Sequence, residues 1–447
     1  MSRRSGSIMR RGHLAAVWGD AEWHPELLFA LPWPQPGADP GEFVERADAS
    51  IGGPWPAPLL SDYARYPRDG DRTSYERAVF SRMDRVATSV VAALATELPR
   101  YLDEIADGLQ LLCEQSTWCW PAHDDVFART GGVAADPAHP YLDLGAGEVA
   151  SLFAWTRFAL AESLDARYPG LGDRMRDEVD RRVLEPFTER RDWHWLGLDG
   201  RLHNWNPWIH GNVIVAAAAF ADAGRSRAIA DLAVDGIDRY LAEMPADGGV
   251  DEGFGYWWNG VARVLDTLEA LDRASAGTLD VGRLDGLTEL VRFPLRMQLG
   301  RDWVLGFADA EPRPADAHPW RIPHYWGRRL ALPDVVAHAS GFDRVVPAAA
   351  APNNGLGRIL AALGDPEWAS APAGQPPLPA SVVLDSLSLA LAREHEASEA
   401  GLAIAVKGGH NAENHNHNDL GSVTVALDGA PAVIDVGRPT YDARTFG

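Results

Sequence analysis

Residues 365–391 read DPEWASAPAGQPPLPASVVLDSLSLAL, and this stretch contains the change of pattern that decides the fold. Five prolines fall within residues 365–381, a density typical of a linker and incompatible with a regular helix or a central strand. After residue 381 leucines alternate with smaller residues, so the period becomes two, as in a half-buried strand. The chain therefore divides here into two regions of different secondary structure.

The region before the linker has the periodicity of helices. Apolar side chains recur at steps of three and four in residues 229–241, 149–160 and 261–268. The segments between helices are rich in Trp, His, Asn and Gly, and they cover residues 116–125, 192–212, 247–259 and 309–326. Because chemistry tends to lie on loops held by a rigid scaffold, we expect stacked helical hairpins whose loops gather on one face, as in an (α/α) toroid.

The region after the linker has the pattern of an antiparallel sheet. Alternation recurs in residues 402–406 and 423–427, and Asp428-Gly429 predicts a hairpin turn before a strand at 432–436. Four or five strands cannot close a two-sheet sandwich or cover their edges, so we expect a chain that is incomplete at its C-terminus. The predicted division is an irregular N-terminal arm (residues 1–73), a toroid (74–364), a Pro-rich linker (365–380) and the beginning of a β-sandwich (381–447).

Composition and charge restrict the partners. The 447 residues include 41 Lys and Arg against 63 Asp and Glu, a net charge of −22, which repels nucleic acids and anionic membrane surfaces. An acidic ligand must therefore be held by local groups. The 17 Trp suit sugar rings, although core packing is their commoner use.

The compartment is predicted from missing signals. No stretch is apolar over the length of a membrane span, and the N-terminus lacks a signal-peptide core. We expect a cytoplasmic protein without a transmembrane segment, or an exported one if the true start of the chain differs. The sequence does not indicate an oligomeric state.

The most informative polar segment, residues 407–419, reads KGGHNAENHNHND. In extended backbone His415 and His417 lie on one face, an arrangement frequent in metal and catalytic sites. Asp435, one hairpin later, could reach back as an oxygen ligand. The alternative is a solvated polar loop.

A second segment, residues 202–212, reads LHNWNPWIHGN and opens a helix expected over 213–223. The Asn204 amide could bind a carboxylate without adding charge, and Trp205 and Trp208, with His203, could contact a sugar ring. The alternative is an elaborate helix N-cap with Trp packing.

A third segment, residues 247–260, reads DGGVDEGFGYWWNG. Tyr256 is a candidate proton-transfer group if its neighbours lower its pKa, and a packing residue otherwise. Further candidates are Asp251 or Glu252, with Asp124 or Asp125 as partner, for the acids of a glycosidase. Arg321 and His324 are candidate substrate contacts or structural residues.

Taken in the order of the chain, Trp193-His194-Trp195, the segments at 202–212, 247–260 and 407–419 and the strand at 433–437 resemble the heparinase II/III-like polysaccharide lyases, from about residue 80 to the end of the chain. The resemblance implies an (α/α) toroid followed by an antiparallel β-sandwich that continues past residue 447. It also implies that Asn204 neutralises a substrate carboxylate and that Tyr256 and His415 transfer protons. His417 and Asp435 match positions that hold zinc in some members, whose remaining ligand would lie beyond this chain. One departure is Trp205, where several oligo-uronate lyases carry His.

The function implied is β-elimination from a uronic acid residue of an acidic oligo- or polysaccharide. Two alternatives stay open: a glycoside hydrolase on the same toroid, and a non-catalytic glycan-binding protein.

Overall fold

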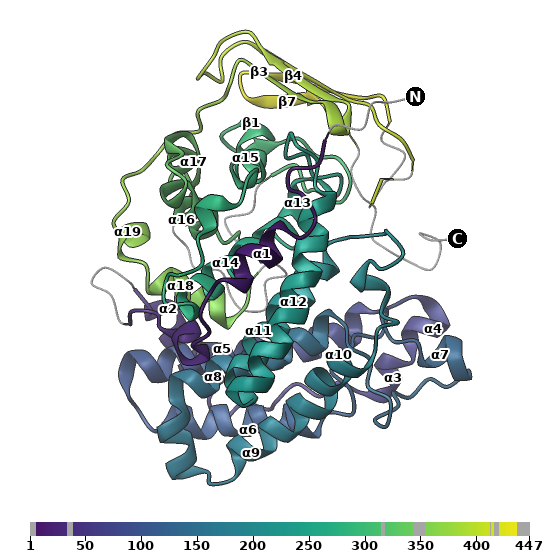
Figure 1. The fold of residues 1–447 in the computed structure, drawn as a ribbon, viewed down its shortest axis with the longest axis vertical. Helices are drawn as coiled ribbons and strands as arrows, with labels where there is room; N and C mark the ends of the chain where they lie inside the picture. Colours follow the sequence, from purple (N-terminus) through teal and green to yellow (C-terminus); the bar gives the residue numbers. More distant parts are fainter. Residues whose placement is uncertain are drawn as a thin grey trace.

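The computed structural model describes residues 6–33, 39–313, 318–342, 354–411, 413–414 and 420–435. Helices come first and the main sheet last (Figure 1). The helices are α1 (His13–Gly19), α2 (Gly41–Ser50), α3 (Leu60–Tyr63), α4 (Arg65–Asp69), α5 (Thr73–Thr96), α6 (Arg100–Glu114), α7 (Val126–Thr130), α8 (Leu144–Arg167), α9 (Leu171–Val179), α10 (Glu185–Glu189), α11 (Trp205–Phe220), α12 (Ala223–Glu243), α13 (Gly253–Trp257), α14 (Val261–Ala274), α15 (Leu287–Arg296), α16 (Arg321–Arg329), α17 (Pro333–Ala339), α18 (Leu356–Leu363) and α19 (Pro366–Ala369). Short 3-10 or π turns are η1 (Pro25–Phe29), η2 (Asp180–Leu184), η3 (His194–Leu196), η4 (Val281–Arg283) and η5 (Asp385–Leu387).

The helical period of the sequence is confirmed at all three predicted segments. Residues 149–160 lie in α8, 229–241 in α12 and 261–268 in α14. Helix α11 packs against α8, α12 and α14 and so lies at the centre of the toroid (Figure 1). None of its residues is exposed, as expected for a helix enclosed by others, and the buried ones include the polar Asn206, His210 and Asn212.

The N-terminal segment differs from the irregular arm expected over residues 1–73, because its described part contains η1 and α1 to α4. A distant carboxylate fixes α1: Asp238 of α12 is fully buried and accepts hydrogen bonds from the backbone N–H groups of Gly12 (2.6 Å) and Leu14 (2.8 Å). These bonds satisfy donors that the first turn of a helix leaves unpaired. The sequence near residue 13 holds no such capping group, so the helix depends on tertiary contact.

Five strands form one antiparallel sheet in sequence order: β3 (Ser381–Leu384), β4 (Leu389–Arg393), β5 (Leu402–Lys407), β6 (Ser422–Leu427) and β7 (Ala430–Val433). Strands β5 and β6 confirm the predicted alternation. Asp428 and Gly429 both have positive φ, as a two-residue hairpin turn requires. Leu387 was expected in a strand but lies in η5, because the backbone N–H and hydroxyl of Ser386 bind Asp247 of the toroid (2.9 and 2.7 Å).

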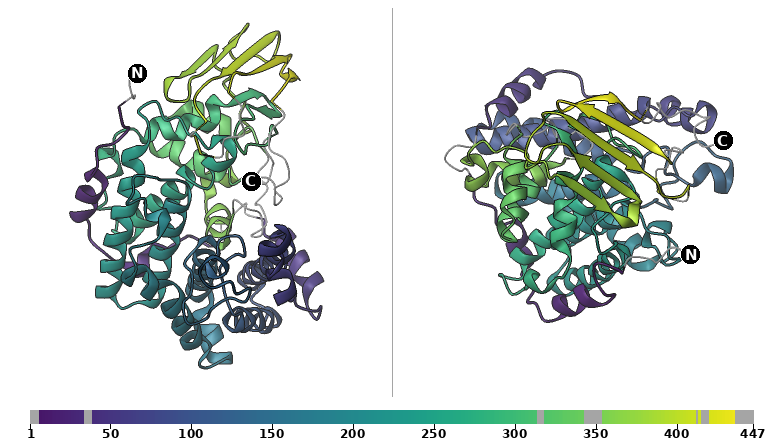
Figure 2. Two further views of the ribbon diagram at one scale, coloured as in Figure 1. Left: turned by 90° about the vertical axis from the view of Figure 1, so that its right-hand side faces the viewer. Right: turned by 90° about the horizontal axis from the view of Figure 1, so that it is seen from above.

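The sheet lies across one end of the helical region (Figure 2). A two-stranded hairpin of the toroid, β1 (Gln298–Gly300) and β2 (Trp303–Val304), meets the turn between β6 and β7. The approach is close, since a Cβ on Gly300 would lie 2.3 Å from the carbonyl oxygen of Gly429. Between the two regions the chain forms α19 and then an irregular stretch to residue 380. No helix among the described residues is long and apolar enough to cross a membrane.

Candidate functional site

The loop that follows β5 reaches the helical region through Asn414. The backbone N–H of Asn414 donates to Asp251 (3.1 Å), and its side-chain amide donates to Asp251 (3.1 Å) and to the carbonyl of Leu202 (3.4 Å). Leu202 is two residues before Asn204, and Asp251 is five residues before Tyr256. The structure therefore brings all three polar segments together where toroid and sheet meet.

A buried ion pair shapes the beginning of this loop. Lys407, at the end of β5, binds Glu413 (2.7 Å) and the carbonyl of Gly408 (2.7 Å), and its ammonium lies 5.4 Å from the ring centroid of Phe307. Both charged side chains of the pair are almost fully buried. Because breaking a buried pair leaves an uncompensated charge, this contact fixes the path of the loop toward Asn414.

Asn204 lies at the N-terminus of α11 and is 1% exposed. Its backbone N–H donates to Glu252 (3.5 Å), and its side chain makes no capping bond. Neither the nitrogen nor the oxygen of the amide has a hydrogen-bond partner within the described part of the chain. An unpaired buried amide is costly, and this one does not serve as the helix cap of α11. The helix also begins at Trp205, earlier than the residue 213 expected from the sequence.

Tyr256 is half-buried in α13, and its carbonyl oxygen and the Cβ of Asn204 both lie near Gly260. Its carbonyl accepts the N–H groups of Asn259 (3.0 Å) and Gly260 (2.9 Å), which closes a turn before α14. A Cβ on Gly260 would lie 3.6 Å from the Cβ of Asn204 and 2.6 Å from the hydroxyl oxygen of Tyr240. The close approach requires glycine at residue 260.

Three imidazoles surround Trp205. Its ring centroid lies 4.2 Å from that of His123, 4.9 Å from His194 and 5.8 Å from His203. The Nδ1 of His123 lies 2.7 Å from Asp143, and burial lowers the pKa of His123, so its ring is neutral near pH 7. His194 belongs to the Trp193-His194-Trp195 motif that precedes the second segment, whereas His123 was not singled out in the sequence; its place in the polar loop 116–125 was the available signal.

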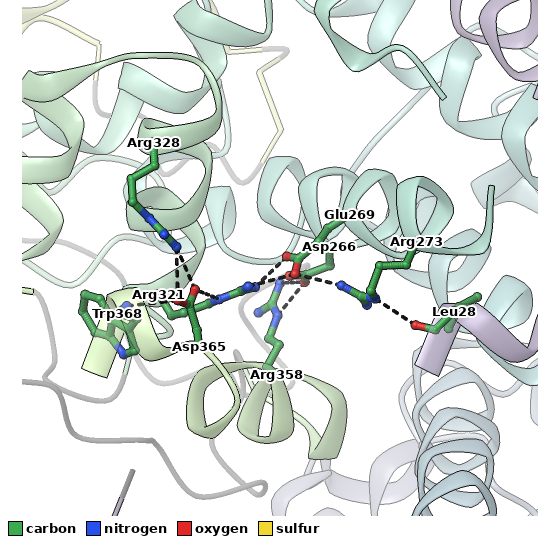
Figure 3. Close-up of polar contacts among 9 residues, drawn as sticks. All are labelled: Leu28, Asp266, Glu269, Arg273, Arg321, Arg328, Arg358, Asp365 and Trp368. Atoms are coloured by element: carbon green, nitrogen blue, oxygen red, sulfur yellow. Dashed lines mark hydrogen bonds and ion pairs between the residues drawn. The ribbon is translucent and has the colours of Figure 1, made fainter. Parts of the chain in front are cut away.

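Other predicted contacts lie inside the helical region. Trp208 is 5% exposed and donates its Nε1 hydrogen to Glu148. Arg321 is buried and ion-paired with Glu269 (2.6 Å) and Asp365 (2.9 Å), as Figure 3 shows. His324 is 2% exposed and packs against Trp368, with ring centroids 5.1 Å apart. The structure therefore places these side chains in buried packing and does not bring them to the Asn414 contacts.

The acids proposed for a glycosidase already have structural partners. Asp251 accepts hydrogen bonds from Asn414, Glu252 is 2% exposed beside the backbone of Asn204, and Asp124 accepts the hydroxyl of Tyr63. Asp125 caps α7.

The predicted metal ligands are only partly described. His415 and His417 lie outside the described residues, whereas Asp435 follows β7 and is partly buried. No three His, Cys, Asp or Glu side chains in the described ranges lie close enough to hold a metal ion. The zinc site stays a prediction, since of its two candidate ligands the described residues supply only Asp435.

The sequence matches no family model and no curated protein. Solved structures of polysaccharide lyases do share its fold. The match to a solved structure of heparinase III covers 94% of this chain and 68% of the heparinase III chain, with 10% sequence identity and a TM-score of 0.56. The match to the structure of a heparinase III gene product covers 90% of this chain and 58% of the other, with 13% sequence identity and a TM-score of 0.54. The heparan sulfate lyase HepC from Pedobacter heparinus covers 95% and 60%, with 13% identity and a TM-score of 0.50.

These likenesses establish the fold. The chain has the heparinase-like architecture of a helical toroid followed by an antiparallel sheet, as the sequence motifs implied. The chain spans about 58% of the heparinase III gene product and 60% of HepC.

Proposed function

We propose that this protein is a polysaccharide lyase that cleaves uronic-acid-containing glycans by β-elimination. The observation that carries the proposal is the Asn204 amide, buried and without a partner among the described residues, at the meeting point of the segments that bear Tyr256 and His415. The heparinase-like fold supports a lyase at the level of architecture.

The first requirement of the reaction is to make a weakly acidic proton removable. The C5 proton of a uronate lies next to a carboxylate, whose negative charge opposes formation of the enolate. Asn204 would donate a hydrogen bond to that carboxylate and stabilise the charge that develops on it. Donors held rigidly in a water-poor site stabilise such charge strongly. The burial of Asn204 provides that environment, and substrate entry must open it.

The second requirement is proton transfer. Tyr256 or His415 takes the C5 proton, and Tyr256 protonates the glycosidic oxygen as the C4–O bond breaks and the C4–C5 double bond forms. Lys407, Glu413 and Asn414 hold the part of the loop that precedes His415 in the sequence. Elimination consumes no water, so the reaction needs no metal-activated hydroxide.

The assay incubates the protein with a panel of uronate polymers and oligomers and measures the ultraviolet absorbance of the unsaturated uronate product. We expect Asn204→Ala and Tyr256→Phe each to lower the rate by about 100-fold or more, the range for loss of one charge-stabilising or proton-transfer group. Tyr66→Phe, a half-buried tyrosine on α4, is the matched control and should leave the rate unchanged.

Other outcomes discriminate between the alternatives. New reducing ends without ultraviolet absorbance would identify a glycoside hydrolase. Binding of the panel without any cleavage would identify a glycan-binding protein. Full lyase activity in both Asn204→Ala and Tyr256→Phe would refute the assigned roles.

A further inference from the structure

A cavity of about 90 Å³ lies inside the toroid, between α8, α11, α14 and α18. It begins close to the candidate site, because Pro207, Trp208 and Gly211 of α11 line it. At 1.5 Å of rise per residue, Trp208 is about 6 Å along the helix axis from Asn204. On the neighbouring helix α14, Arg263 lines the cavity one turn beyond Gly260.

Two buried arginines from different helices line this cavity. The guanidinium of Arg263 lies 4.7 Å from the ring centroid of Trp208 and binds Glu148 at 2.9 Å. Its Nε has no hydrogen-bond partner among the described residues. Arg358 of α18 binds Asp266 (2.7 Å) and the carbonyl of Trp258 (3.0 Å).

The carboxylates of the lining are already occupied by donors of the protein. Glu148 accepts hydrogen bonds from Trp208, Asn212 and Arg263. Glu269 binds both Arg321 and Arg273 (Figure 3). The lining contains Arg263, Arg273, Arg321 and Arg358 against Glu148, Asp266 and Glu269, and the further partner of Arg321, Asp365, lies outside it.

The two arginines also repel one another. The pKa of Arg358 falls to about 10, first because of burial and then because of the charge of Arg263. A bound anion between them would relieve this repulsion. Trp208 and Trp155, which also line the cavity, offer aromatic surface of the kind that packs on sugar rings.

We propose that this cavity, the Arg263–Arg358 pocket, binds the anionic group of an acidic sugar next to the one held at Asn204. The proposal rests on the proposed lyase function and names a second recognition point for the same substrate. It also accounts for how a chain of net charge −22 could bind a polyanion, since the attraction comes from local guanidinium groups.

A double variant removes the charge of Arg263 from the pocket without leaving its buried partner Glu148 as an unpaired charge. Glu148→Gln/Arg263→Gln replaces both members of the ion pair by neutral amides. The matched control is Glu178→Gln/Arg182→Gln, a buried pair in which Arg182 similarly lies over a tryptophan, 4.6 Å from the Trp118 ring centroid. The cavity beside that pair is only about 10 Å³, room for about one water molecule.

The experiment titrates the intact chain with glucuronate, inorganic sulfate and glucose by calorimetry. We expect glucuronate to bind the wild-type chain, the pocket variant to bind it at least tenfold more weakly, and the control variant to bind as the wild type does. Glucuronate binding should persist in Asn204→Ala, which separates the pocket from the catalytic site. Thermal melting of each variant checks folding.

Several results would overturn the proposal: no glucuronate binding, binding of glucose as strong as that of glucuronate, binding of sulfate alone, or equal weakening in both double variants. If the lyase assay fails while the pocket variant loses glucuronate binding, the proposed reaction is wrong and the binding site stands. If cleavage is found and its KM is unchanged in the pocket variant, the pocket is wrong and the reaction stands.

Discussion

The toroid and the sheet use apolar side chains differently. In the toroid, Leu265 and Leu268 of α14 are completely buried because other helices surround them. In the sheet, Ile404 and Val406 of β5 are 44% and 45% exposed. An antiparallel sheet with one solvated face normally carries polar side chains on that face. The outer face of this sheet is instead apolar, a surface of the kind that proteins usually cover.

In strand β5 the smaller residues lie on the inner face of the sheet. Ala403 and Ala405 of β5 point toward the toroid and are buried, while the larger residues that alternate with them, Leu402, Ile404 and Val406, point outward. The arrangement is confined to part of the sheet, since Leu384 of β3 and Leu389 and Leu391 of β4 are buried on the inner face in the ordinary way. Alternation along a strand thus indicates two faces, and the size of the residues does not say which one is covered.

The largest effect in this comparison is expected inside the toroid. Glu269→Ala should lower the free energy of unfolding by about 3–5 kcal/mol, because it leaves the buried guanidinium of Arg321 without a main partner. Chemical denaturation measures the change. The control Asp173→Ala removes an exposed partner of Arg176 and should change stability by less than about 1 kcal/mol. Equal effects of the two variants would contradict the difference between buried and exposed pairs.

The next largest effect on the free energy of unfolding is expected in a pH series, and it comes from His338 of the toroid. Burial lowers the pKa of His338 to about 3, whereas the unfolded chain has the ordinary value near 6.5. The unfolded state therefore binds the proton first as pH falls, so stability is complete above about pH 6.5 and declines below it. The slope is about 1.4 kcal/mol per pH unit for one such group.

His338→Gln should make the acid dependence of the unfolding free energy shallower, measured by denaturation between pH 7 and pH 5. The control His139→Gln changes an exposed side chain and should leave the slope as in the wild type. A wild-type slope in His338→Gln would show that His338 is not the neutral buried group described.

The smallest change in stability is expected on the outer face of the sheet. Ile404→Thr and Val406→Thr should shift the free energy of unfolding by about 0.5 kcal/mol or less, since neither side chain is buried. Both should reduce the fluorescence of a dye that binds exposed apolar surface. Ala405→Leu, on the inner face, should instead cost about 1–3 kcal/mol through overpacking. Unchanged dye binding in the two threonine variants would mean that this face is covered in solution.

Local pattern predicted much of the fold. The core helices α8, α12 and α14, the strands β5 and β6, and the Asp428-Gly429 turn follow from residues close in sequence. Helix α1 and turn η5 do not, because Asp238 and Asp247 fix them from far along the chain. Pattern alone shows no such partner.

The site was predictable to a similar degree. The three polar segments were found from composition, and the structure joins them through Asn414. The burial of Arg321 and the packing of His123 on Trp205 follow from tertiary contacts that spacing does not encode.

Because of the contacts of Asn414, the proposed active site forms only while the toroid and the sheet keep their relative positions. Leu202 and Asp251 belong to the toroid, whereas Asn414 belongs to a loop of the sheet. A hinge-like separation of the two would dismantle the site and leave every helix intact. Thermal inactivation should then precede the loss of helical circular dichroism, with product formation failing first.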